Sequence, residues 1–159
     1  MKYSPQFISD FARRTLLNLD RIQQAEHDGE SDVFPVTQLW NSLLGLIVLP
    51  RERDESLIPD LPTAAMWADG WHPIRERKGE SRTLRELVGH LRNAVSHGGV
   101  EFVPNEDREI AELTLWNFPS GRWDQSPEKR TWEAVVAVSD LERLARRIAS
   151  TYADVFAKV

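Results

Sequence analysis

Apolar residues recur at the spacing of an amphipathic helix in four long stretches of the chain. These stretches predict helices over residues 5–26, 36–49, about 81–97 and about 139–157. The second is apolar almost all round, a pattern typical of a helix at the centre of its domain, and Pro50 is expected to end it. The last is expected to begin at a capping box that runs from Ser139 to Glu142.

Three shorter stretches alternate between apolar and polar residues, as half-buried strands do. They are Gly99–Val103, Ile110–Asn117 and Thr131–Val138. A turn over residues 119–122 predicts a hairpin between the last two, and Trp116 and Trp132 are expected to pair across it. Residues 51–82 are predicted to be irregular, apart from a short helix around residues 63–68. The predicted fold class is mainly α, a helical bundle with a small two- or three-stranded antiparallel sheet before its last helix.

Length and composition narrow the class of protein further. A chain of 159 residues predicts one domain over residues 1–159. Without cysteine, the chain cannot contain a disulfide, a thiolate zinc site, an iron–sulfur cluster or a cysteine nucleophile. The longest apolar run, residues 43–49, is far shorter than the roughly 20 residues of a membrane span, and the first residues do not resemble a signal peptide. We therefore expect a cytoplasmic protein that does not contact membranes.

The net charge of −5 argues against a protein that coats nucleic acid through bulk electrostatics. A local basic site remains compatible with it, because 16 of the 20 cationic side chains are arginine. Arginine is the residue suited to bidentate contacts with phosphate, whereas lysine mostly supplies a point charge.

Most of the chemistry that the sequence offers lies in residues 84–99. On a helical wheel, the apolar face of this segment is opposite a polar ridge with spacings of four, three and four residues. The ridge consists of Glu86, His90, Asn93 and His97. Arg92 flanks it. A solvated helix face would normally carry lysine, glutamate and glutamine instead.

Three interpretations of this ridge are open. A metal site is disfavoured, because His90 and His97 are seven residues and about 10.5 Å apart along a helix, too far to share one ion. A structural interpretation places His97 at the negative end of the helix dipole, with Arg92 in an ion pair and Asn93 as a buried bridge. The third interpretation is phosphate chemistry without a metal or another cofactor.

Cleavage of RNA by its own 2′-hydroxyl requires a base for that proton, an acid for the leaving 5′-oxygen and cations near the phosphorane. Histidine titrates near neutrality and fits either proton-transfer role. Arginine neutralises phosphate charge through its planar fork, and a neighbouring asparagine can orient an imidazole. One helix supplies only one such set, so two copies that meet across a dimer axis would complete the site.

Residues 92–97, Arg-Asn-Ala-Val-Ser-His, match the Arg-x4-His signature of the HEPN superfamily (higher eukaryotes and prokaryotes nucleotide-binding). The resemblance extends to residues 36–51, which look like the second helix of a compact plasmid-borne HEPN family, and to the order of helix, signature, short sheet and capped final helix. It therefore covers nearly the whole chain.

The resemblance implies a four-helix up-and-down core that homodimerises along the signature helix. Members are similar to toxin, phage-defence and CRISPR-associated endoribonucleases that cleave RNA without a metal. By this resemblance Arg92 contacts the scissile phosphate, His97 is the acid–base residue, and Asn93 orients the imidazole or the phosphate. The expected partners are RNA, a second copy of the chain, and an antitoxin or another protein; DNA is not expected.

Three further polar residues are candidates for substrate binding or for holding the catalytic residues in place through hydrogen bonds: His90, Glu86 and Asn41. The superfamily also contains members that only bind a nucleotide or a partner protein. A non-catalytic HEPN-like binding module is therefore the alternative function.

Overall fold

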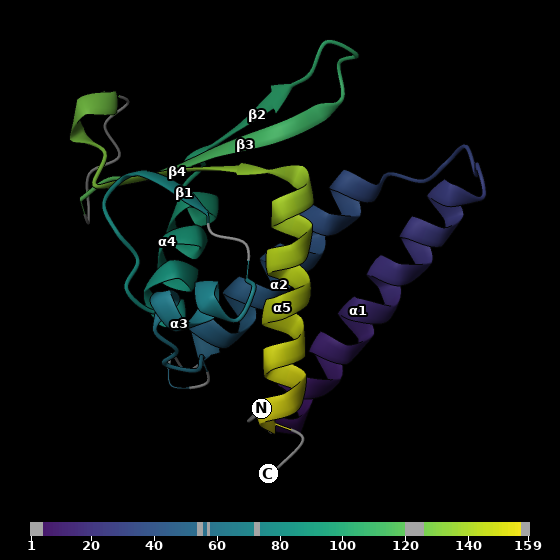
Figure 1. Ribbon diagram of the computed structural model, residues 1–159, viewed down its shortest axis with the longest axis horizontal. Coiled ribbons are helices and arrows are strands. Elements are labelled where there is room, and N and C mark those ends of the chain that lie inside the picture. The colour runs from purple at the N-terminus through teal and green to yellow at the C-terminus, as the bar shows by residue number, and fades with distance from the viewer. Residues whose placement is uncertain (1–4, 54–55, 57, 72–73, 120–125, 157–159) are drawn as a thin grey trace. The chain divides into compact units, whose positions relative to one another are not determined.

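The computed structural model describes residues 5–53, 56, 58–71, 74–119 and 126–156 (Figure 1). The chain divides into two compact units, residues 1–57 with 142–159 and residues 58–141. The described secondary structure consists mainly of helices α1 to α5 and one antiparallel sheet, with a short 3-10 helix, η2 (Pro127–Lys129), before the last strand. None of the helices in these ranges is long and apolar enough to span a bilayer.

The first unit contains α1 (Pro5–His27), α2 (Pro35–Arg53) and most of α5 (Val138–Phe156). Hydrogen bonds show that α1 and α5 are antiparallel, because residues early in α1 contact residues late in α5. Ser9 Oγ donates to the carbonyl oxygen of Ala153 at 3.3 Å. Near the other end, Arg146 Nη1 lies 2.6 Å from Asp20 Oδ1.

Two predicted boundaries of these helices are wrong. Pro50 does not end α2, which continues to Arg53. Pro50 is buried, as are Leu46 and Ile47, and packing of this turn compensates for the one backbone hydrogen bond that proline cannot donate. Helix α5 begins at Val138, one residue before the predicted cap at Ser139.

The second unit is built on a four-stranded antiparallel sheet with the strand order β1-β4-β3-β2. The strands are β1 (Arg75–Lys78), β2 (Val100–Pro104), β3 (Ile110–Asn117) and β4 (Trp132–Ala137). The predicted hairpin between β3 and β4 is confirmed by their antiparallel pairing, although residues 120–122 of its turn lie outside the described residues. Helix α4 (Leu84–Ser96) packs against this sheet, and α3 (Thr63–Ala68) precedes β1.

The sheet is larger than the predicted two or three strands, because β1 forms within the segment expected to be irregular. Its sequence, Arg-Glu-Arg-Lys, contains no apolar residue and so carries no alternation that could reveal a strand. Charged side chains of this kind are typical of an edge strand that resists pairing with other molecules. Pairing with β4 defines it, together with ion pairs from Arg75 to Glu112 and from Arg77 to Glu133.

The register of β3 and β4 places Trp116 and Trp132 on opposite faces, so the predicted cross-strand pair is wrong. Trp132 lies opposite Asn117, whereas Trp116 lies opposite Glu133. A shift of one residue in register exchanges the two faces of a strand. Trp132 is fully buried on the face that meets α4, while Trp116 lies beneath the guanidinium group of Arg130, 4.2 Å from its ring centre.

The coarse prediction of a helix-rich chain with an antiparallel sheet is confirmed, but the four-helix bundle is not. Helices α1 and α2 belong to one unit with most of α5, whereas α4 belongs to the unit that contains the sheet.

Candidate functional site

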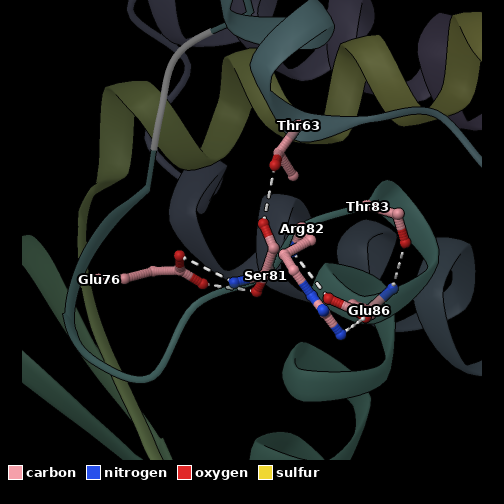
Figure 2. A network of polar contacts seen from close by, with 6 residues as sticks. All are labelled: Thr63, Glu76, Ser81, Arg82, Thr83 and Glu86. Atoms are coloured by element: carbon pink, nitrogen blue, oxygen red, sulfur yellow. Dashed lines mark hydrogen bonds and ion pairs between the residues drawn. The ribbon is translucent and has the colours of Figure 1, made fainter.

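The start of α4 is closed by a reciprocal cap (Figure 2). Thr83 is the N-cap residue, and its Oγ1 accepts from the backbone N–H of Glu86 at 3.2 Å. Glu86 Oε2 accepts in return from the backbone N–H of Arg82 at 2.8 Å, and its Oε1 lies 3.0 Å from Arg82 Nη2. These bonds hold the pKa of Glu86 below its usual value, and the bond from the backbone N–H of Arg82 has the largest effect. Glu86 stabilises the start of α4 and lies about 16 Å along the helix from His97.

Replacing Thr83 by alanine is expected to lower the free energy of unfolding by about 1 kcal/mol, because one backbone N–H of the first turn loses its acceptor. Urea denaturation followed by circular dichroism measures this loss. Thr37→Ala is the matched control, since Thr37 is exposed on α2, and it should change stability by less than about 0.5 kcal/mol. Equal losses in the two variants would contradict the cap.

The segment before α4 is attached to the sheet through Glu76 on β1. Thr63 Oγ1 donates to the carbonyl oxygen of Ser81 at 2.8 Å, and the backbone N–H of Ser81 donates to Glu76 Oε2 at 3.1 Å (Figure 2). The indole Nε1 of Trp132 donates to Glu76 Oε1 at 2.6 Å. The half-buried carboxylate of Glu76 on β1 thus binds both Trp132 on β4 and Ser81, which lies shortly before α4.

The other end of α4 is closed by two consecutive glycines, Gly98 and Gly99. His97 is the C-cap residue, and Gly98 follows with a φ of 73°. The N–H of Gly98 donates to the carbonyl of Val95 at 3.2 Å, and the N–H of Gly99 donates to that of Ala94 at 2.7 Å. This is the hydrogen-bond pattern of a Schellman motif. Strand β2 begins directly after it.

Arg92, Asn93 and His97 lie at the C-terminal end of α4, with His97 as its C-cap residue. Arg92 Nη1 donates to Asn93 Oδ1 at 3.1 Å, and the N–H of His97 donates to the carbonyl of Asn93 at 3.2 Å. Asn93 and His97 are exposed, and Arg92 is half-buried. Because the amide oxygen of Asn93 accepts from Arg92, its nitrogen is the group that can donate to a phosphate or to an unprotonated imidazole.

His90 is separated from this group, since its side chain faces the sheet. Its ring stacks on Trp132 with 5.0 Å between ring centres and 6° between ring planes. Asn117 Nδ2 lies 3.2 Å from His90 Nδ1. Burial lowers the pKa of His90 below its usual value, against the opposing charges of Glu76 and Glu86. The predicted polar ridge is therefore divided, with Asn93 and His97 exposed and His90 packed against β3 and β4.

Two residues that contact His90 were not among the sequence candidates. Asn117 lies on the same buried face of β3 as Leu113 and Leu115. A polar residue at a position where the alternation predicts an apolar one was the sequence feature that could have identified it. The contact of Trp132 with His90 depends on how α4 packs on the sheet, which no local pattern in the sequence reveals.

Asn41 is exposed on α2, in the other unit, and its role stays a prediction. Among the residues that the structure describes, no three His, Asp or Glu side chains gather in a group that could hold a metal ion.

The family described as HEPN pEK499 p136 matches residues 1–157. No curated protein and no solved structure matches the chain. The family match covers all but the last two residues and includes both units. The chain therefore belongs to this HEPN family.

Proposed function

We propose that the chain is an endoribonuclease of the HEPN type that cleaves RNA by attack of the 2′-hydroxyl and needs no metal. The observation that carries the proposal is the C-terminal end of α4, where Arg92 Nη1 contacts Asn93 Oδ1 and both Asn93 and the C-cap residue His97 are exposed. Membership of a HEPN family supports the same conclusion. This combination supplies a cation, an amide donor and a proton-transfer group.

In the proposed reaction the 2′-oxygen attacks phosphorus and gives up its proton to an imidazole, which acts as the base. The bond between phosphorus and the 5′-oxygen breaks, and that oxygen takes a proton from an acid. The products end in a 2′,3′-cyclic phosphate and a 5′-hydroxyl. Arg92 neutralises the charge that develops on the non-bridging oxygens, and the Asn93 nitrogen donates to one of them.

The reaction needs a base and an acid at the same phosphate, and one α4 supplies a single exposed histidine, His97, beside Arg92. We therefore propose a homodimer in which two copies of α4 contribute one His97 each, the first as base and the second as acid. A role as a toxin or phage-defence effector in the cytoplasm, controlled by an antitoxin or another protein partner, follows from the family resemblance.

The proposal is tested with a mixed-sequence single-stranded RNA and purified protein in EDTA. Wild-type protein is expected to release fragments that end in 2′,3′-cyclic phosphate, and His97→Ala is expected to release none. His27→Ala is the matched control, because His27 is exposed on α1, far along the chain from α4, and it should cleave as the wild type does. Cleavage that persists in His97→Ala would contradict the assignment of the site.

The alternative is a non-catalytic module that binds a nucleotide or a partner protein, and charge favours the partner protein. The net charge is −5, and the hairpin that follows His97 carries the exposed acidic residues Glu101, Glu106, Asp107 and Glu109. An acidic neighbourhood repels the phosphate backbone. Absence of cleavage by wild-type dimers, checked by light scattering, would favour this alternative.

A further inference from the structure

Asn117, the last residue of β3, joins the sheet to the middle of α4. Its side chain is buried, with 4% of the residue exposed. Nδ2 donates to the backbone carbonyl of His90 at 3.0 Å and lies 3.2 Å from the Nδ1 atom of the same residue. The carbonyl of Asn117 accepts from the backbone N–H of Thr131 at 2.8 Å. The amide is thus held at the sheet while it contacts the helix.

These contacts determine the orientation of the amide and the form of the imidazole. The carbonyl of His90 can only accept, so the atom of Asn117 that faces it must be the nitrogen donor. The second N–H of that nitrogen is then directed to His90 Nδ1, which must be unprotonated to accept it. The imidazole is therefore neutral, with its proton on Nε2.

The same amide leaves its oxygen without a hydrogen-bond partner among the described residues. A buried acceptor without a donor costs free energy, so the donor side of Asn117 is the side that contributes. The stacked ring of Trp132 closes the other side of His90.

Two consecutive residues of β3 hold α4 on either side of the candidate site. Asn117 contacts His90, and the N–H of Trp116 donates to the carbonyl of Gly99 at 2.9 Å. Arg92, Asn93 and His97 all lie between these two attachments. We propose that Asn117 is a positioning residue that, through neutral His90, sets the placement of the Arg92–His97 turn for RNA cleavage. This inference rests on the proposed function for its catalytic consequence, but its structural part is independent of activity.

Protonation of His90 would break the contact between Asn117 Nδ2 and His90 Nδ1, because a proton on Nδ1 would face the N–H of Asn117, and would leave only the bond to the backbone carbonyl. The charged groups that act on the ring, Glu76 on β1 and Glu86 on α4, favour the charged form, but burial outweighs them and lowers the pKa of His90. A lowered pKa means that the stabilisation is complete above the pKa of the unfolded chain. It is lost as the pH falls through the pKa of the folded protein.

The structural part is tested by long-range ¹H–¹⁵N correlation spectra of the imidazoles. Wild-type His90 should show the Nε2–H tautomer at pH 7.5 and should titrate below the usual pKa of histidine. In Asn117→Asp the carboxylate cannot donate, so His90 should titrate at higher pH and gain a proton on Nδ1. Asn18→Asp is the matched control, since Asn18 is exposed on α1, and it should leave His90 unchanged. If His90 of the wild-type protein is charged or carries its proton on Nδ1, this result alone overturns the inference.

The positioning part is tested on the side-chain resonances of Arg92, Asn93 and His97. These should shift in Asn117→Asp and in the milder Asn117→Ser, and stay unchanged in Asn18→Asp. Unchanged resonances in both Asn117 variants would overturn the positioning role, even in a protein that cleaves no RNA.

The catalytic consequence is measured as a split between kcat and KM. A displaced turn is expected to lower kcat by about 10-fold or more while KM changes by less than about 2-fold. Asn117→Ser, which keeps one hydroxyl donor, should recover part of the loss. An unchanged kcat beside altered His90 signals would overturn the positioning role. Inactive wild-type protein would instead refute the proposed function and leave the spectra to decide the inference.

Discussion

Replacing Arg92 by alanine is expected to reduce RNA cleavage by about 10²- to 10³-fold, the typical loss when one donor that stabilises a transition-state anion is removed. Arg92 lies on the last turn of α4, where its Nη1 contacts Asn93 Oδ1. The substitution therefore removes the cation proposed to face the phosphorane and releases the amide that it orients. We expect the effect mainly in kcat, because the phosphorane carries more charge than the ground-state phosphate.

A comparison with Arg92→Lys separates charge from geometry. Lysine keeps the positive charge but lacks the planar fork that contacts two oxygens, so this variant should retain an intermediate rate. The matched control is Arg147→Ala, since Arg147 is exposed on α5, and it should cleave within about 2-fold of the wild type. Single-turnover cleavage in EDTA, with thermal unfolding to verify folding, measures the series. Equal activity of Arg92→Ala and Arg147→Ala would contradict a role for Arg92.

Replacing Gly99 by alanine is expected to lower the free energy of unfolding by about 3 kcal/mol, at the upper end for overpacking a rigid site. A Cβ on Gly99 would lie 2.2 Å from the carbonyl oxygen of Trp116. That oxygen belongs to the backbone and cannot rotate away as a side chain would. Gly99 is itself held by hydrogen bonds to Ala94 and Trp116 at 2.7 and 2.9 Å, so relief of the clash must separate α4 from β3.

The adjacent glycine provides the control for this effect. Gly98 has a φ of 73°, but a Cβ there would meet no atom within 4 Å. Gly98→Ala should therefore cost only the left-handed backbone penalty, about 1 kcal/mol. Urea denaturation of both variants distinguishes a steric requirement from a conformational one. If Gly98→Ala is the more destabilising of the two, the close approach of Gly99 to β3 does not limit stability.

The features that the sequence predicted correctly depend on neighbours along the chain. The periodicity of Leu84, Leu87, Val88 and Leu91 predicted a buried face, and all four are buried. The left-handed turn at Gly98 that ends α4 follows from the backbone freedom of glycine. The cap from Thr83 to Glu86 is also local, so its motif was readable in the sequence although only the structure identified it.

The sequence by itself thus determined the helices and the position of Arg92, Asn93 and His97 at the C-terminal end of one of them, because helical hydrogen bonds join residues only three or four positions apart. The tertiary structure alone decided that His90 faces the sheet, that β1 extends it, and that Trp116 and Trp132 lie on opposite faces. The deciding contacts join distant positions, 27 residues apart for Asn117 and His90 and 56 for Glu76 and Trp132. Strand register determines which side chains of β3 and β4 face α4, and a shift of one residue would turn Asn117 and Trp132 to the opposite face of the sheet.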